Sequence, residues 1–150
     1  MKDAGFEHYE ISNFAKAGFR SKHNSSYWQG KHYLGLGPSA HSFNGNSRQW
    51  NIANNALYIQ SLKEGILSPE IEILTAEQQF NEYVMTSLRT MEGIRLEKVE
   101  EDFGTEKVNY LLNAAKPYVT LRQLEFDNVH LRTTNTGKLL ADGIASDLFI

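Results

Sequence analysis

The chain has 150 residues and a net charge of −3, and 41% of its residues are hydrophobic. This length allows one ordinary domain or two small units, and the composition argues against global disorder. Cysteine is absent, which excludes disulfides, thiolate catalysis and cysteine-ligated metal centres within this chain. No run of about 18 apolar residues predicts a membrane span, and the N-terminus lacks the apolar segment of a secretory signal. We therefore expect a reducing, cytoplasmic location.

The charge is unevenly distributed along the chain. Residues 1–69 sum to +3, whereas residues 70–150 sum to −6. Four of the five histidines lie within the first 41 residues. The sequence therefore predicts two units, 1–68 and 69–150, which meet near Ser68-Pro69.

The N-terminal unit combines short strands with long polar segments. Residues 6–11 alternate loosely and predict a strand, whereas residues 12–31 are rich in Ser, Asn, Gly and Lys and predict a loop. Residues 32–37 predict a short buried strand, which residues 39–43 can extend. Residues 48–51 are expected to pair back as a hairpin.

A helix is predicted over residues 54–64, with Leu57 and Leu62 facing inward and Gly65 ending it. A long loop with a few strands and one helix does not make a convincing domain by itself. We therefore expect residues 1–68 to be the edge of a larger sheet whose other strands lie upstream, so that the chain is an incomplete part of a larger protein.

The C-terminal unit has regular helical periodicity. Thr75 to Gln78 fits a capping box, apolar residues follow at helical spacing over residues 80–91, and Gly93 is the predicted end. A second short helix is predicted over residues 96–103, ending at Gly104.

The rest of this unit predicts a helix, a hairpin and a helix. Thr105 is the expected cap of a third helix, which Pro117 breaks. Residues 124–131 alternate around a central Asp-Asn pair and predict a β-hairpin. A last helix follows Gly137 and carries Leu140, Ile144 and Leu148 inward. Three helices, a hairpin and a closing helix are the pattern of a winged-helix-like domain, so the predicted fold class is α+β.

The densest group of chemically versatile side chains is His23-Asn24-Ser25-Ser26-Tyr27-Trp28. An imidazole can ligate a metal or transfer protons near neutral pH, and Tyr and Trp offer flat faces for a planar ligand. Basic residues flank the group and would favour an anionic ligand: Arg20, Lys22 and Lys31. The alternative is that Tyr27 and Trp28 cover the edge of a core while His23 caps a loop.

A second group spans residues 33–43. Gly35 and Gly37 allow close approach of the backbone to a ligand or to another strand, and His41 follows small residues at the rim of the expected strand. The pattern is not a dinucleotide fingerprint, because the third glycine and the following helix are missing. A tightly packed strand and turn is the alternative.

Other candidates have simpler explanations. The acidic run over residues 97–106 is typical of a solvated helix face, and His130 in the hairpin is expected to be structural. A winged-helix pattern also raises DNA or protein binding, but the third helix holds only Lys107 and Lys116 as cations in a unit of charge −6. We therefore expect no nucleic-acid partner.

Three motifs over residues 9–42 resemble the oxygen-independent coproporphyrinogen III oxidase-like family, and are most similar to its radical-SAM haem chaperone branch. The C-terminal half is similar to that family's C-terminal domain. The motifs are Tyr9-Glu10-Ile11-Ser12-Asn13-Phe14-Ala15, His23-Asn24-x-x-Tyr27-Trp28, and Tyr33-Leu34-Gly35-Leu36-Gly37-x-x-Ala40-His41-Ser42.

The resemblance implies a partial (β/α) radical-SAM barrel, in which three cysteines hold a [4Fe-4S] cluster and S-adenosylmethionine binds its open iron. Residues 1–68 would be the closing strands of this barrel, and residues 69–150 the winged-helix-like domain. The cysteines are missing here, so this chain alone is expected to hold no cluster and to catalyse nothing.

The resemblance also implies binding residues and partners. Haem or porphyrin, haem-accepting proteins and the missing N-terminal barrel would be the partners, with self-association possible. His23 would ligate the haem iron. The residues implied in binding S-adenosylmethionine are Gly37, Ser39, Ala40 and His41, and those implied in binding haem are His23, Asn24, Tyr27 and Trp28. The alternative within the family is anaerobic oxidative decarboxylation of coproporphyrinogen III, against which the His-Asn-x-x-Tyr-Trp motif argues.

Overall fold

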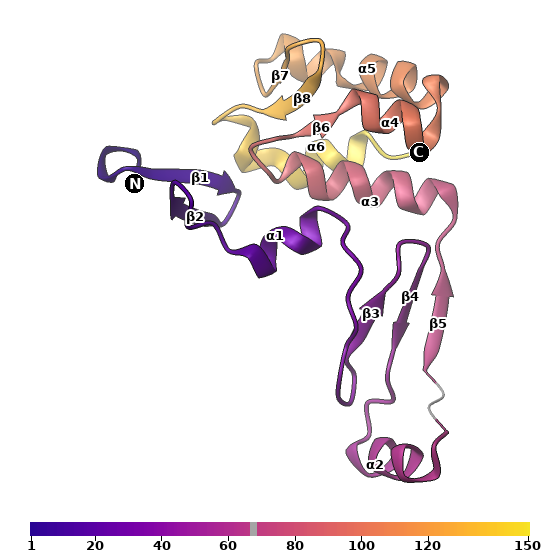
Figure 1. The fold of residues 1–150 in the computed structure, drawn as a ribbon. Coiled ribbons are helices and arrows are strands. Elements are labelled where there is room, and N and C mark those ends of the chain that lie inside the picture. The colour runs from indigo at the N-terminus through magenta and orange to yellow at the C-terminus, as the bar shows by residue number, and fades with distance from the viewer. Residues whose placement is uncertain (67–68) are drawn as a thin grey trace. The chain divides into compact units, whose positions relative to one another are not determined.

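The computed structural model describes residues 1–66 and 69–150. Contacts divide the chain into two compact units (Figure 1), which we call unit 1, residues 1–28 and 76–150, and unit 2, residues 29–75. Of the predicted boundary Ser68-Pro69, Ser68 lies outside the described residues. The compact units meet at residues 28/29 and 75/76, so unit 1 includes both ends of the chain.

Unit 1 contains most of the helices and two small antiparallel sheets, of order β1-β2 and β6-β8-β7. Its elements are η1 Lys2–Ala4, β1 Phe6–Glu10, β2 Asn13–Lys16, α1 Lys22–Trp28, α3 Ala76–Leu88, β6 Ile94–Arg95, α4 Leu96–Phe103, α5 Thr105–Thr120, β7 Leu124–Phe126, β8 His130–Thr133, η2 Gly137–Leu140 and α6 Ala141–Asp147.

Unit 2 consists of an antiparallel sheet of order β3-β4-β5 and one helix, α2. Its elements are β3 His41–Phe43, β4 Ser47–Trp50, α2 Asn55–Glu64 and β5 Glu70–Ile73. These helices and sheets confirm the predicted α+β class. None of the helices in residues 1–66 and 69–150 is long and apolar enough to cross a membrane.

The hydrophobic core of unit 1 lies among helices α3 to α6 and the sheet β6-β8-β7. Phe80, Val84 and Leu88 repeat at helical spacing along α3, so all three face the same side and are completely buried. The helices α3 and α6 lie against each other (Figure 1). The rest of the buried cluster is Ile94, Leu96, Val99, Leu111, Ala115, Leu124, Leu131, Ile144, Ala145 and Leu148.

The hairpin β1-β2 is attached to this core through the segment that follows α3. The amide of Ile11 donates to the carbonyl of Arg89 at 3.0 Å, and the amide of Met91 donates to the carbonyl of Tyr9 at 3.0 Å. Tyr9 is buried. The N-terminal residues therefore belong to the same unit as the C-terminal helices.

The prediction of a loop over residues 12–31 is wrong, because this stretch holds β2 and α1. Strand β2 forms through pairing with β1, from Phe6 opposite Lys16 to Glu10 opposite Asn13. Helix α1 begins where the hydroxyl of Ser21 accepts a hydrogen bond from the amide of Asn24 at 3.2 Å. Polar residues that are typical of loops thus form regular structure here.

The buried strand predicted over residues 32–37 is also wrong. Only an isolated bridge pairs Tyr33 with Phe43, and Leu34 and Leu36 are 71% and 81% exposed. The φ angle of Gly37, 107°, bends the chain out of strand geometry. The hairpin predicted to follow is confirmed, because β3 and β4 pair in antiparallel register.

The limits of α2 match the prediction, with Asn54 as its cap and Gly65 ending it in the left-handed region. The predicted inward face is wrong, since Leu57 and Leu62 are about half exposed. The half-buried side of the helix carries Tyr58 instead. Strand β5, which pairs with β4, was not predicted.

The helices of the C-terminal region follow the predictions with two differences. Helix α4 and the β7-β8 hairpin are confirmed, but α3 ends at Leu88, before the predicted Gly93. Helix α5 continues through Pro117, because a proline removes only one amide donor and the next turn closes with Leu121 donating to the carbonyl of Pro117 at 3.0 Å. Leu140 is half exposed, since it belongs to η2 rather than to α6.

Candidate functional site

Helix α1 carries the complete His23–Trp28 cluster and lies on the surface of unit 1. None of its residues is buried. His23 and Tyr27 lie one helical turn apart, both exposed, with their rings edge to face at 5.1 Å between centroids. Neither ring nitrogen of His23 makes a hydrogen bond within the described residues. The residues of the His23–Trp28 cluster thus lie on one surface helix, and their role in haem binding stays a prediction.

Helix α1 is fixed to the hairpin β1-β2 by its polar and aromatic side chains. The Asn24 amide donates to Oδ1 of Asn13 at 3.3 Å, and the Asn13 amide donates to Oε2 of Glu10 at 2.5 Å. The indole of Trp28 meets the ring of Tyr9 edge-on at 5.9 Å. Trp28 thus packs toward the hairpin, while His23 and Tyr27 are presented to solvent.

Arg20, two residues before this helix, is already paired with two carboxylates. The Arg20 guanidinium pairs with Glu92 at 2.7 Å and with Glu7 at 3.1 Å, and it lies over the ring of Tyr9. The hydrogen bond to Glu92, followed by that to Glu7, raises the pKa of Arg20. The expectation that Arg20 attracts an anion is therefore wrong, because two carboxylates already neutralise it. Lys22 remains exposed at the start of α1.

The Gly37–His41 segment lies in unit 2 and is held by hydrogen bonds from side chains. The Asn51 amide donates to the carbonyls of Gly37 at 2.9 Å and Gly35 at 3.3 Å. The amide of Gly35 donates to the hydroxyl of Ser42 at 2.9 Å, and that of Gly37 to the hydroxyl of Tyr58 at 3.2 Å. The close approach that glycine permits here is to another strand, since a Cβ on Gly35 would lie 2.2 Å from the carbonyl oxygen of His41.

The backbone amides of this segment are used internally. The amide of Ser39 donates to the carbonyl of Ile52 and that of Ala40 to the carbonyl of Gly37, both at 3.3 Å. Ser39 has a φ of 59°, a conformation that is uncommon for a residue with a side chain. A ligand at this segment would therefore be contacted by the exposed side chains of Ser39 and His41 rather than by the amides of Gly37 and Ala40.

The imidazole of His41 is the first of three neighbouring side chains in a row across the sheet. His41 is paired with Trp50, and Trp50 with Glu70, in adjacent strands. The His41 and Trp50 rings lie 5.8 Å apart at 33°, and the indole N–H donates to Glu70 at 3.0 Å. The hydrogen bond to Glu70 fixes the Trp50 ring beside His41.

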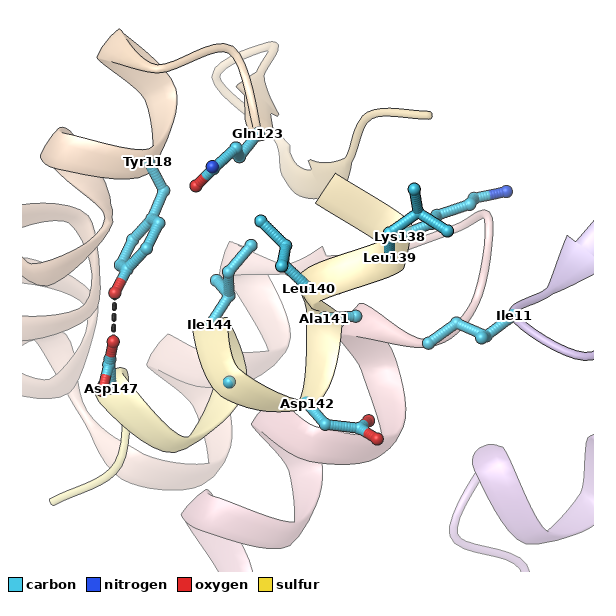
Figure 2. A pocket seen from close by; sticks show the side chains of 11 residues that line it. Ile11, Tyr118, Gln123, Lys138, Leu139, Leu140, Ala141, Asp142, Ile144 and Asp147 are labelled. Carbon is cyan, nitrogen blue, oxygen red and sulfur yellow. Dashed lines mark hydrogen bonds between the residues drawn. The ribbon is translucent and has the colours of Figure 1, made fainter. Parts of the chain in front are cut away.

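A separate, open hollow of about 690 Å³ lies in unit 1 along η2 and α6 (Figure 2). Its lining includes Ile11, Leu140 and Asp142, and a hydrogen bond from Tyr118 to Asp147 lies at one side. That hydrogen bond raises the pKa of Tyr118. The lining contains none of the residues predicted to bind haem or S-adenosylmethionine, so the hollow does not coincide with either predicted site.

The residues that hold both candidate segments were not predicted as such. Glu10 and Asn13 anchor α1, and Asn51 anchors the segment 37–41. Glu10 and Asn13 lie within the first of the three motifs, which was a signal for them. Asn51 is the last residue of the predicted hairpin segment 48–51 but had no distinguishing sequence feature.

Comparisons with known proteins cover almost the whole chain. The model of the HemN C-terminal domain matches residues 74–140. Heme chaperone HemW of Bacillus subtilis (strain 168) is 31% identical over 145 residues, which are 96% of this chain and 38% of that protein. By these matches, the chain is similar to the C-terminal part of HemN-like proteins. The family resemblance expected from the three motifs is therefore confirmed.

Further relatives agree with this similarity. Heme chaperone HemW of Mycobacterium tuberculosis (strain ATCC 25618 / H37Rv) is 30% identical over 149 residues, which are 99% of this HemN-like chain and 36% of that protein. A solved structure titled "Coproporphyrinogen III oxidase (HemN) from Escherichia coli is a Radical SAM enzyme" has the same fold, with a TM-score of 0.72 over 99% of this chain at 18% identity. The chain spans 38% of the Bacillus relative and 38% of the Escherichia structure.

Proposed function

We propose that this HemN-like chain is the haem-handling part of a radical-SAM haem chaperone, which receives haem at helix α1 and passes it to haem-requiring proteins. The observation that carries the proposal is the exposed pair His23 and Tyr27 on α1. The chain's similarity, at 30% and 31% identity, to heme chaperones of Mycobacterium tuberculosis and Bacillus subtilis supports the proposal. A cytoplasmic location, haem-accepting protein partners and self-association belong to the same proposal.

The chemistry of α1 fits a haem group. An imidazole is a common axial ligand of haem iron, and the ring nitrogens of His23 have no competing partner among the described residues. Tyr27 offers a partly exposed ring beside that imidazole, which suits the flat, apolar face of a macrocycle. Asn24 and Trp28 hold the helix against β1-β2, so they would orient these two side chains.

The Gly37–His41 segment is proposed as a contact for S-adenosylmethionine. Ser39 and His41 would contact it through exposed polar side chains, while Gly37 and Ala40 shape the turn. When bound at a [4Fe-4S] cluster, S-adenosylmethionine supplies radical chemistry in this family. This chain contains no cysteine, so the cluster ligands would come from outside it.

Haem titration of the 150-residue chain tests the first part of the proposal. His23→Ala is expected to shift the Soret band and to weaken haem affinity by about tenfold or more, because an iron ligand is lost. The matched control is His32→Ala, which removes another exposed imidazole, one that lies edge-on to Phe43, and is expected to leave both unchanged. Identical Soret spectra and affinities for the three proteins would exclude His23 as the ligand.

The competing activity is the oxidative decarboxylation of coproporphyrinogen III. A whole protein that carries this chain is expected to bind haem without sustained formation of protoporphyrinogen under reducing, anaerobic conditions. Rapid turnover in that assay would contradict the chaperone proposal.

A further inference from the structure

The motif over residues 9–15 has no part in ligand binding in the proposal above, although it lies shortly before the haem helix, which begins at Lys22. It forms the end of β1, the turn and the start of β2. Its side chains face two partners in unit 1, the end of α3 on one side and helix α1 on the other. This placement raises the question of what the motif contributes to the haem helix.

Glu10 begins a series of side-chain hydrogen bonds that runs from this motif to α1. Its side chain is only 2% exposed, and the guanidinium of Arg89 pairs with Oε1 at 3.0 Å. The other oxygen, Oε2, accepts from the amide of Ser12 at 2.9 Å and from the side chain of Asn13 at 2.5 Å. A buried carboxylate with partners on both oxygens is held in one orientation.

This carboxylate imposes a direction on the hydrogen bonds that follow. An ionised carboxylate can only accept, so the NH₂ group of Asn13 must point to Glu10. The oxygen of Asn13 is thereby left to face α1, where it can only accept, and it receives the NH₂ group of Asn24 at 3.3 Å. Neither amide can be turned over without losing a partner.

Helix α1 relies on polar and aromatic side-chain contacts for its attachment, because it buries none of its own residues. It has seven residues and none of them is buried, and helices of this length are not stable in isolation. Two further contacts with the hairpin are the Tyr9–Trp28 ring pair and, just before α1, the hydrogen bond from the Ser21 amide to the Tyr9 hydroxyl at 3.3 Å.

We infer that Glu10 and Asn13 are positioning residues of the haem site, which set the orientation of α1 and hence of His23. They act through two hydrogen bonds in series, from Asn24 to Asn13 and from Asn13 to Glu10, in which each donor and acceptor is fixed. The inference rests on the proposed function for its link to haem. The orientation of α1 itself is independent of that proposal and can be measured without haem.

The test uses the substitution of Asn by Asp at two positions with opposite roles. Asn24→Asp keeps the shape of the side chain but removes the donor that Asn13 requires. Asn54→Asp is the matched control, because the side chain of Asn54 only accepts, from the amides of Ala56 and Leu57 at the start of α2. The two variants are compared with the unaltered 150-residue chain by NMR and by haem titration.

We expect Asn24→Asp to weaken the nuclear Overhauser effect between the Tyr9 and Trp28 rings, to shift the α1 resonances and to lower haem affinity about 2- to 10-fold. The resonances of α3 are expected to stay in place, which separates this effect from unfolding. Asn54→Asp is expected to change none of these signals. Asn13→Asp, which places a second carboxylate next to that of Glu10, is expected to shift the α1 resonances in the same way.

Each contrary result has a distinct meaning. Unchanged α1 resonances in Asn24→Asp would overturn the positioning role, whatever happens to haem affinity. Displaced α1 resonances with unchanged haem affinity would overturn the link between this chain and the haem site. If His23→Ala does not affect haem binding, the proposed function fails, while the NMR comparison still decides whether Glu10 and Asn13 position α1.

Discussion

Unit 1 and the smaller unit 2 hold their folds in different ways. Unit 1 has a continuous core of completely buried side chains on α3 to α6. Among the described residues of unit 2, the buried side chains are Ser42 and Leu74. Its loops are fixed by hydrogen bonds in which the Asn51 side chain donates and the hydroxyls of Ser42 and Tyr58 accept. Helix α1 resembles unit 2 in this respect, since it also lacks buried residues. Both candidate binding segments therefore lie where polar contacts, rather than apolar burial, determine the geometry.

The largest expected effect tests the core of unit 1. Phe80→Ala removes a completely buried ring and is expected to lower the free energy of unfolding by about 3–5 kcal/mol. Leu62→Ala in α2 is the control, because that side chain is 48% exposed, and it is expected to cost less than about 1 kcal/mol. Urea unfolding followed by circular dichroism measures both. Equal losses would show that unit 2 is as dependent on apolar contacts as unit 1.

A smaller effect is expected from a change of backbone packing in unit 2. Gly35→Ala places a Cβ 2.2 Å from the carbonyl oxygen of His41 and is expected to cost about 1–3 kcal/mol. Gly143→Ala in α6 has open space around it and is expected to stabilise the protein by up to about 1 kcal/mol. Trp50 fluorescence, in a Trp28→Phe background, follows the unfolding of unit 2, and circular dichroism of the helices follows the unfolding of unit 1. The comparison between the units fails if both substitutions change the free energy of unfolding in the same direction.

The smallest effect is a local response to pH within unit 1. The pKa of Asp127 is lowered from 3.8 to about 2. The largest cause is the hydrogen bond from the backbone amide of His130, followed by that from Val129, and the Arg132 side chain adds to it. Because the folded pKa is lowered, this stabilisation is present above about pH 4 and is lost as the pH falls through about 2. The amide resonances of Val129 and His130 are expected to shift in that range, and Asp127→Asn is expected to abolish the shift. Simultaneous loss of the core resonances would contradict a local effect.

The difference between the units also explains what was predictable from the sequence. Apolar residues at helical spacing predicted α3, α4 and α5, because burial on one face leaves a periodic pattern. Strand β2 and helix α1 left no such pattern, since side chains such as those of Asn13 and Ser21 are equally typical of loops. Pro117 was misleading because the loss of one hydrogen bond did not end a helix that is otherwise well packed.

The same reasoning applies to the candidate site. The cluster His23–Trp28 was identified from its residue types, and the structure places those residues on one short helix. The role of Glu10 was not predictable, because its burial depends on Arg89, which lies 79 residues away in the sequence. A local sequence pattern cannot show which of several polar side chains a distant partner will bury.

The construction of unit 1 from both ends of the chain has a consequence for how the protein folds. The contacts that attach β1-β2 to the end of α3 connect residues about 80 positions apart in the sequence. Local helices form within microseconds, whereas such distant contacts must wait for a large loop to close. Docking of the hairpin should therefore be a late step in folding. A protein trimmed to residues 74–140, the matched HemN C-terminal domain, would lack the hairpin and leave Arg89 without Glu10. The sequence boundary of the family domain is thus not the boundary of the compact unit, which also includes residues 1–28.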